Sequence, residues 1–338
     1  MKNLYKYTGI ALAFLGTVLT TSCETDSAYE DEPASIAAIA VANPAFTTLE
    51  AAAILGDVAV TLSNSNGGDP SGDFTVFAPT DDAFARLGLK ETTLGVLQQP
   101  FLKSTLLYHV SNGNLLSSSI MDGGTASSLL GPTRRFIERD GALYINGSEI
   151  LATDISASNG TVHVIDKVMI ASGANVVQTA LALNDGNVFK NPELTFLVAA
   201  VVYADLVGPL SDSEASYTVF APTDAAFKAT LETVLGGDYT GTTDDIAKLD
   251  TALGAGTVQA ILLNHVFADA SAGKFTSELN AGTYDALGSD DITLGAFTDG
   301  VLSVSGSGNP SPANMVIPDV QTTNGIVHVI DQVLLPNL

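Results

Sequence analysis

Two stretches of ten residues in this chain are nearly identical. Residues Thr75 to Phe84 read TVFAPTDDAF and residues Thr218 to Phe227 read TVFAPTDAAF, so nine of the ten positions agree. A long stretch that returns so far along the chain indicates that one structural unit is used twice. The length of 338 residues suits two average domains. We therefore expect two copies of one domain.

The order of residue types inside the stretch predicts a strand followed by a helix. Thr75 to Phe77 are β-forming residues and suit a buried strand. Pro79 ends that strand because it has no N–H to donate. Thr80 stands where its hydroxyl can cap a helix N-terminus, and the acids after it suit the positive end of the helix dipole. Phe84 is then the first large apolar residue of the helix and should attach it to the core.

The segments around the two stretches also correspond. Asn43-Pro44 and Asn191-Pro192 each predict the start of a helix whose apolar residues recur at helical spacing. A later helix is expected from Phe101 to Leu107 in the first copy, and its counterpart from Val258 to Leu263 in the second. Each of these later helices ends in a histidine followed by a valine.

Strands follow this later helix in each copy, and we expect them to be antiparallel. Asn159-Gly160 and Asn324-Gly325 each predict a two-residue hairpin turn between the last two strands. The expected strands are Arg134–Glu138, Leu143–Ile145, Ile150–Ile155 and Thr161–Val168 in the first copy, and Val316–Val320 and Ile326–Leu334 in the second. Two segments are rich in Gly and Asp. We interpret Asn64 to Asp73 as a turn and Gly236 to Asp250 as a loop.

Composition restricts the classes of partner. The formal net charge is −24, only 15% of residues are charged and 46% are hydrophobic. A folded chain of this charge repels nucleic acid and anionic lipid headgroups, so neither is expected as a partner. Cys23 is the single cysteine, which excludes an intramolecular disulfide and a cysteine-rich zinc site.

The N-terminus has the features of an export signal. Lys2 and Lys6 precede an apolar segment from Gly9 to Leu19, a pattern typical of a signal peptide. A cysteine directly after it resembles the lipobox of bacterial lipoproteins, although Leu19 lies one position further from Cys23 than that pattern has it. The resemblance implies a lipid on Cys23. An ordinary signal peptide with an incidental cysteine is the alternative.

Acidic residues then dominate up to Glu32, and this segment should be a solvated tether. An acidic run after a lipidated cysteine resembles the surface-export signal of Bacteroidetes-type lipoproteins. We therefore expect an outer-membrane lipoprotein on the cell surface, with the periplasm as the alternative.

The four histidines occupy two equivalent positions in each copy. His109 and His265 end the long helices, and His163 and His328 lie in the last strands. Their spacing matches no metal-binding pattern. We expect half-buried structural histidines bonded to backbone or to a nearby carboxylate such as Asp166 or Asp331, rather than ligands or acid–base groups. No nucleophile elbow or phosphate-binding loop occurs either, so neither a cofactor nor an enzymatic activity is expected.

Taken together, the repeated motifs resemble the fasciclin-type domain along nearly all of residues 35–335. The TVFAPTD stretch, the helix-ending histidine and the NGxVHVID strand occur in the same order in both copies. The resemblance implies an α+β fold of two tandem fasciclin-type β-wedge domains, each with two small sheets and flanking helices. The expected boundaries are 1–22 for the signal peptide, 23–34 for the lipid-anchored acidic tether, and 35–170 and 174–335 for the two domains.

The resemblance also implies candidate partner-binding residues. In matrix members of the family, an Asp-Ile pair before the Asn-Gly turn and a Tyr-His pair are implicated in receptor binding. The first copy has Asp154-Ile155 and Tyr108-His109 at these positions. The second copy has Asp319-Val320, and it departs from the Tyr-His pair at Asn264. A structural interpretation remains open, because Ile155 continues an apolar alternation and His109 suits a core.

Members of this family are mostly extracellular adhesion modules. We therefore expect a non-enzymatic adhesion lipoprotein whose partners are extracellular polysaccharide or a matrix or cell-surface protein, and which meets the membrane only through the lipid on Cys23. Two alternatives are a scaffold of the periplasm or envelope, and a small-ligand binder that uses a cleft between the domains.

Overall fold

The computed structural model describes residues 33–191, 193–268 and 273–337. Residues 33–338 form one compact unit. The predicted signal peptide at 1–22, Cys23 and most of the acidic tether at 23–34 lie outside the described residues. Among the described residues no single helix is long and apolar enough to cross a membrane, although two sharply bent helix pairs together pass that test of length and composition.

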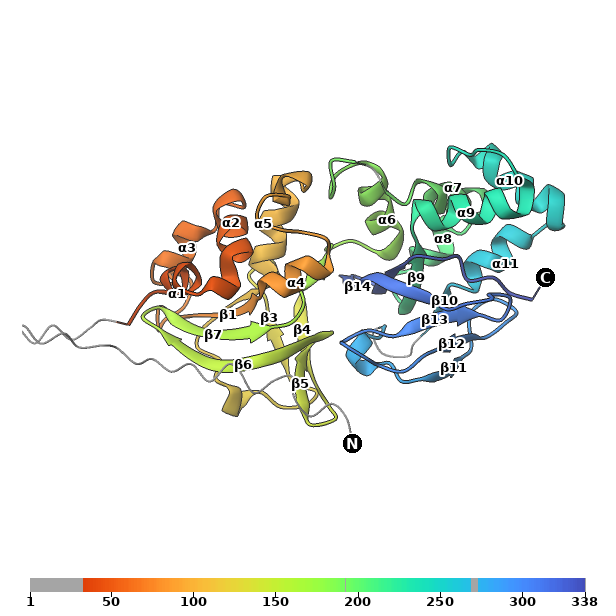
Figure 1. Cartoon of the computed structure of the whole chain (residues 1–338). Helices are drawn as coiled ribbons and strands as arrows, with labels where there is room; N and C mark the ends of the chain where they lie inside the picture. The colour runs from red at the N-terminus through yellow and green to blue at the C-terminus, as the bar shows by residue number, and fades with distance from the viewer. Residues whose placement is uncertain (1–32, 192, 269–272, 338) are drawn as a thin grey trace, which may run out of the picture. The chain divides into compact units, whose positions relative to one another are not determined.

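The first domain begins with helices and continues as a sheet (Figure 1). Its elements are α1 (Ile36–Ala42), α2 (Thr47–Leu55), α3 (Ala59–Ser63), β1 (Phe74–Pro79), α4 (Asp81–Arg86), α5 (Gln99–Tyr108), β2 (Val110–Asn112), β3 (Thr125–Ser127), β4 (Thr133–Arg139), β5 (Ala142–Ile145), β6 (Ser148–Ala157) and β7 (Gly160–Ile165).

The second domain repeats this order with one additional helix and one additional strand, β8. Its elements are β8 (Ile170–Ala171), α6 (Val176–Asn184), α7 (Thr195–Tyr203), α8 (Val207–Leu210), β9 (Tyr217–Pro222), α9 (Asp224–Leu235), α10 (Thr243–Leu253), α11 (Thr257–Leu263), β10 (Val266–Ala268), β11 (Gly282–Tyr284), β12 (Ile292–Leu294), β13 (Ser303–Gly306), β14 (Ala313–Thr322) and β15 (Gly325–Ile330). The α+β fold expected for both copies is confirmed.

The repeated stretch forms the strand, cap and helix that its sequence predicts. All six residues of β1 are buried. The Thr80 hydroxyl accepts a hydrogen bond from the Ala83 N–H at 3.2 Å, and Thr223 accepts one from the Ala226 N–H at 3.2 Å. Phe84 is 2% exposed. The cap and the buried phenylalanine together fix the direction in which each helix leaves its strand.

In both domains the second and third strands of the sheet form a parallel pair, which corrects the expectation of antiparallel strands alone. The strand order is β2-β1-β7-β6-β5-β4-β3 in the first domain, and β10-β9-β15-β14-β13-β12-β11 in the second. β1 pairs with β7 and β9 with β15, both in parallel. The partners lie a whole domain apart in sequence, so local patterns carry no sign of their direction.

The bend of each wedge is made by one long strand. Within β6, register shifts occur between Ile150 and Ala152 and again between Ala152 and Ile155. Such bulges bend a strand and increase its twist. β6 therefore pairs with β5 near its start and with β7 over the rest of its length. β14 has the equivalent shifts. The two halves of each wedge are thus continuous through one bent strand.

The last hairpin of each domain depends on a glycine. The register pairs Ala157 with Gly160, so the two turn residues are Ser158 and Asn159, one position earlier than the Asn-Gly pattern predicts. A Cβ on Gly160 would lie 1.8 Å from the Phe74 backbone oxygen, and one on Gly325 would lie 2.3 Å from that of Tyr217. Each glycine therefore lets the last strand approach β1 or β9 closely.

The segment from Gly236 to Asp250 is not the loop that its composition suggested, because most of its second half belongs to α10. Thr242 and Asp245 form a capping box at the N-terminus of this helix, which satisfies two backbone donors. Ile246 and Leu249 are buried on one face. A polar segment with two apolar residues three positions apart was sufficient to make a short amphipathic helix.

Several expected boundaries also shift. β7 and β15 end at Ile165 and Ile330, before the predicted ends at Val168 and Leu334. The helix expected at Asn191-Pro192 begins at Thr195, and Pro192 lies outside the described residues. The joint between the domains is paired into the second sheet, since Ile170 and Ala171 of β8 pair with Val320 and Gln321 of β14.

Candidate functional site

The histidines that end α5 and α11 are core residues. His109 is 2% exposed, its Nδ1 lies 2.7 Å from the Thr105 carbonyl oxygen and its Nε2 accepts the Met169 N–H at 2.9 Å. His265 makes the same two contacts, with Ile261 and Leu334. Burial lowers the pKa of each imidazole to about 4. A neutral ring with both nitrogens bonded serves as a structural bridge.

The histidines in β7 and β15 are equally buried and hold a neighbouring aspartate. His163 Nδ1 accepts the Asp154 N–H at 3.3 Å and its Nε2 lies 2.8 Å from the Leu115 carbonyl oxygen. His328 has the same relation to Asp319, at 3.1 Å. Burial lowers the pKa of both rings. The structural interpretation of the histidines is confirmed, with full rather than half burial, but the expected carboxylates Asp166 and Asp331 are not their partners.

Each of these aspartates caps a short helical turn. Asp154 caps the turn Ser117–Ser119, and Asp319 caps the turn Thr276–Glu278. The Asp154 carboxylate accepts the Ser117 N–H at 2.8 Å and the Ser117 hydroxyl. The Asp319 carboxylate accepts the Thr276 N–H at 2.6 Å and the Thr276 hydroxyl at 2.7 Å. We call these two arrangements the Asp154 corner (Ser117, Asp154, His163) and the Asp319 corner (Thr276, Asp319, His328).

Both aspartates have positive φ angles, 59° for Asp154 and 66° for Asp319. Aspartate is one of the few residue types that adopt this region at low cost. It also supplies the carboxylate that the turn requires. The residue type is therefore selected by backbone geometry as well as by its charge.

The two corners differ in what covers them. Asp154 is exposed, and the hydrogen bonds from Ser117 lower the pKa of its carboxyl, so it presents a negative charge to solvent. Asp319 is 9% exposed. Its burial raises the pKa, but the charges of Lys167 and His328 and the bonds from Thr276 outweigh that effect and lower it overall. Both carboxylates are thus ionised at neutral pH.

Lys167 of the first domain covers the Asp319 corner. Its ammonium lies 3.0 Å from Asp319 Oδ2, 3.0 Å from the Thr276 hydroxyl and 2.6 Å from the Gly300 carbonyl oxygen. Three acceptors satisfy the three protons of the ammonium. A buried ion pair persists only with such complete hydrogen bonding. The Asp319 corner is therefore a lysine-binding site occupied from within the chain.

Two arginines extend this contact between the domains. Arg135 Nη2 lies 2.7 Å from Glu278 Oε2 and its guanidinium covers the Phe275 ring. Arg139 donates to the carbonyls of Thr276, Ser277 and Leu279. At these contacts the first domain supplies the cations and the second supplies the acceptors. Opposite charge and the planar hydrogen-bonding geometry of the guanidinium groups hold the two surfaces together.

The predicted partner-binding residues are not equally accessible. Tyr108 is 0% exposed, and its hydroxyl bonds with Gln321 and Asn146. His109 and Val320 are also buried, while Ile155 is partly exposed. Among the six candidates, Asp154 alone is fully on the surface. Cys23 lies outside the described residues.

Sequence reasoning missed the serine and threonine at the corners, and also Lys167. The local signal for Ser117 and Thr276 is weak, because each lies in a short turn far from its aspartate in sequence. Lys167 directly follows the NGTVHVID motif, where the second copy has Gln332. That difference between otherwise similar motifs was the available signal. The described residues contain no group of three or more His, Cys, Asp or Glu side chains placed to hold a metal ion.

Comparisons with known proteins agree on one family. The fasciclin domain model matches twice, at residues 44–171 and 192–336. Protein sll1483 of Synechocystis is 36% identical over 172 residues, which are 48% of this chain and 91% of that protein. Human periostin is 27% identical over 279 residues, 79% of this chain but 29% of periostin, so this chain spans less than a third of that relative.

A solved structure is also similar. The FAS1 domain pair from the insect cell adhesion molecule fasciclin I has a TM-score of 0.38 and 17% identity, and the likeness covers 78% of this chain and 88% of that one. The two family matches together span most of the described residues and coincide with the two repeats of strand, capped helix and closing hairpin. This chain therefore belongs to the fasciclin domain family and carries two such domains in tandem.

Proposed function

We propose that this chain is an adhesion lipoprotein of the bacterial cell surface that works without enzymatic chemistry. Its domains would be held at the outer membrane by a lipid on Cys23 and would bind a matrix or cell-surface protein or an extracellular polysaccharide. Membership of the fasciclin family supports this function. The acidic charge of −24 suits a molecule that avoids anionic surfaces and selects partners with exposed cations.

The observation that carries the proposal is the exposed Asp154 corner. It has the same hydrogen bonds as the Asp319 corner, in which the carboxylate binds the Lys167 ammonium at 3.0 Å. An ionised aspartate held by Ser117 and His163 is a preorganised acceptor, because its geometry needs no rearrangement on binding. The partner that fits it presents a lysine or arginine side chain, which favours a protein over a neutral polysaccharide.

One exposed corner in each chain implies weak individual contacts. Several copies anchored on one surface would then act together, since each bound copy raises the effective concentration of the next. Multivalency would arise from many chains rather than from the two domains of one chain, because Lys167 already occupies the Asp319 corner.

Location is the first test of this function. Protease is added to intact cells and the protein is followed by immunoblot beside a periplasmic control protein. Digestion of this protein alone is the expected result. Protection until the cells are lysed would exclude cell-surface adhesion and leave a periplasmic or envelope scaffold.

A second candidate function, small-ligand binding between the domains, rests on one cavity. It has a volume of about 270 Å³ and is lined by Leu87 and Phe101 of the first domain and by Ile317 and Val329 of the second, among others. Mass spectrometry of the purified protein under native conditions tests this function. A metabolite that remains bound, and is lost when Phe101→Ala opens the cavity, would favour it over adhesion.

A further inference from the structure

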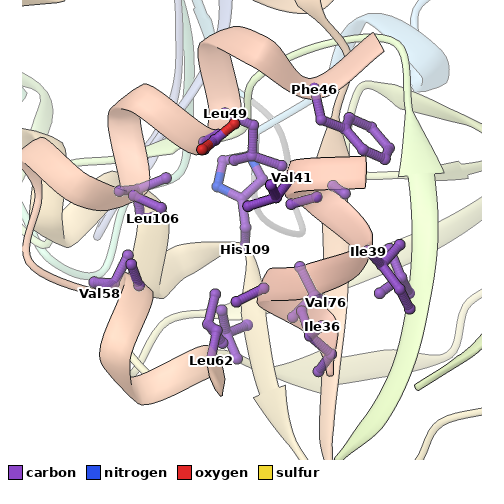
Figure 2. Close-up of a pocket in the computed structure, with 18 of the residues that line it drawn as sticks. Ile36, Ile39, Val41, Phe46, Leu49, Val58, Leu62, Val76, Leu106 and His109 are labelled. Carbon is purple, nitrogen blue, oxygen red and sulfur yellow. The ribbon is translucent and has the colours of Figure 1, made fainter. Parts of the chain in front are cut away.

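A second type of site, independent of the proposed adhesion, lies under the first helices of each domain. In the first domain a cavity of about 230 Å³ separates α1, α2 and α3 from strand β1. Figure 2 shows Ile36, Val58, Leu62, Val76 and Leu106 around this space, with His109 near the middle of the view. The cavity therefore lies between helices and sheet, within a single domain.

The second domain has a cavity at the equivalent place. Its volume is about 210 Å³, and it is lined by α6, α7, α8, β9 and the end of α11. The correspondence can be checked at one bond: the Ile36 N–H donates to the Asn159 side chain, and the Val176 N–H donates to that of Asn324. Leu106 and His109 correspond to Leu262 and His265. Two copies with different sequences have thus kept the same space unfilled.

Both cavities are apolar. Their linings consist almost entirely of aliphatic residues, alanine and phenylalanine, and each contains one histidine. Both ring nitrogens of His109 and of His265 are already bonded to backbone groups, so neither histidine offers a site for water. Cavities of this type stay dry and accept apolar molecules.

Each cavity reaches the surface through exposed apolar side chains. Val41 and Ile54 at the first opening are 62% and 65% exposed, and Leu181 and Val202 at the second are 37% and 52% exposed. Large aliphatic side chains that remain in water beside an apolar cavity are typical of a ligand-binding site. A chain that enters either cavity would leave it along an apolar surface.

We propose that each fasciclin domain of this chain binds a neutral alkyl or aromatic hydrocarbon group of a small free molecule in this cavity. A cavity of about 150 Å³ holds benzene, so by simple scaling these volumes hold about eight or nine carbon atoms. Apart from the bonded histidines, the second lining has no polar side chain and the first has only Glu50 and Ser63, which selects against a ligand with a buried headgroup. The ligand is therefore a short hydrocarbon chain or ring whose polar end stays outside.

The charge of the protein restricts the headgroup that the ligand can carry. Glu50 is the one carboxylate in the lining of the first cavity, and the whole chain has a net charge of −24. A ligand with a carboxylate headgroup would be repelled at this opening. Neutral alcohols or esters are therefore preferred at the first cavity over the matched fatty-acid anion.

The test uses a protein of residues 33–338, which form one compact unit. It is titrated calorimetrically with 1-octanol and, separately, with octanoate at pH 7. Saturable binding of octanol is expected, with octanoate at least tenfold weaker at the first cavity. Equal affinity for both probes would overturn the charge selection, and no saturable binding of octanol would overturn the site itself.

Matched variants assign the binding to the two cavities. Ala40→Leu and Ala180→Leu place three additional carbon atoms at corresponding positions in α1 and α6. Each variant should remove one octanol site, and the double variant should remove two. Ala229→Leu on the exposed surface of α9 should remove none. An unchanged number of sites in the double variant would contradict the proposal.

A second measurement needs only the unmodified protein, in case a variant fails to fold. Under xenon pressure, the methyl resonances of Leu106 and Leu262 should shift and saturate, while those of Leu302 in a separate part of the core should stay unchanged. Equal shifts at all three leucines would refute specific cavities. The protein is also mixed with neutral phosphatidylcholine vesicles. If it binds them and the double variant does not, the ligand is a membrane lipid and the assignment to a free molecule is overturned.

Discussion

The ammonium of Lys167 lies 3.0 Å from a carboxylate oxygen of Asp319, with only 7% and 10% of the two side chains exposed. The lysine belongs to the first domain and the aspartate to the second. The same carboxylate also caps the turn at Thr276. It therefore stabilises a turn within the second domain and, at the same time, the contact between the two domains. This relation distinguishes the second corner from the first.

Replacing Lys167 with methionine should destabilise the protein strongly. The variant leaves Asp319 buried without its cation, a loss that typically costs about 3 to 5 kcal/mol. Urea denaturation measures the change. The matched control is Lys103→Met, whose pair with Asp57 at 3.2 Å is exposed and should contribute less than about 1 kcal/mol. The double variant Lys167→Met with Asp319→Asn should recover part of the loss, and equal stability of the two single lysine variants would refute the buried pair.

Alanine at Gly160 should disrupt the closing hairpin of the first domain. Its Cβ would lie 1.8 Å from the Phe74 backbone oxygen, and the residue has a φ of 142°. Such overpacking should cost more than about 2 kcal/mol. Gly95→Ala is the control, since a Cβ there meets nothing within 4 Å. Thermal unfolding compares the two, and similar midpoints would contradict the close approach of β7 to β1.

Stability should fall as the pH is lowered below about 6.5. Burial lowers the pKa of His109 and His265 to about 4, so in this range the unfolded chain binds protons that the folded chain does not. The stabilisation is complete above the unfolded pKa of about 6.5 and is lost as the pH falls toward 4. Each histidine should remove about 2 kcal/mol between pH 7.5 and 5.0.

A variant separates this effect from other titrating groups. Asp166 and Glu149, whose pKa values burial raises, act in the opposite direction. Urea denaturation of His265→Gln at the same two pH values should therefore show a smaller loss than the unmodified protein, by the amount due to one histidine. Identical losses in the two proteins would show that His265 is not held neutral.

The two helix caps provide a matched pair of small effects. Thr80→Ala and Thr223→Ala each remove a hydroxyl that accepts a backbone N–H at 3.2 Å. Each should cost about 1 kcal/mol. Replacement by serine should restore most of the stability, because the hydroxyl rather than the methyl group makes the bond. A cost below a few tenths of a kcal/mol at both sites would contradict the capping role.

The parts of the fold that follow from local chemistry could be predicted. The strand of Thr75 to Phe77, its end at Pro79 and the cap at Thr80 each depend on residues within one turn of one another. The same holds for the turn from Asn64 to Asp73. The capping box of α10 is equally local, but the glycines and threonines around it favour a loop more strongly than Ile246 and Leu249 favour a helix.

The parts that depend on distant residues could not be predicted. The parallel pairing of β1 with β7 joins segments at opposite ends of the domain. His163 bonds with the Leu115 carbonyl oxygen and not with the nearby Asp166. This choice depends on the path of the loop after β2, which brings Leu115 beside β7. The contrast between an exposed Asp154 and a covered Asp319 arises from docking of the domains, although Lys167 and Gln332 differ visibly at matching positions of the motif.

The most direct test of adhesion through the Asp154 corner is attachment of cells to coated beads. Beads carrying residues 33–338 are mixed with cells of the organism that makes the protein, and attached cells are counted at physiological salt. Asp154→Asn should lose most of the attachment. The control Asp69→Asn, which alters a carboxylate also bonded by a serine, should retain it. Equal attachment by the unmodified protein and by Asp154→Asn would contradict the proposed contact, and no attachment to any bead would contradict adhesion itself.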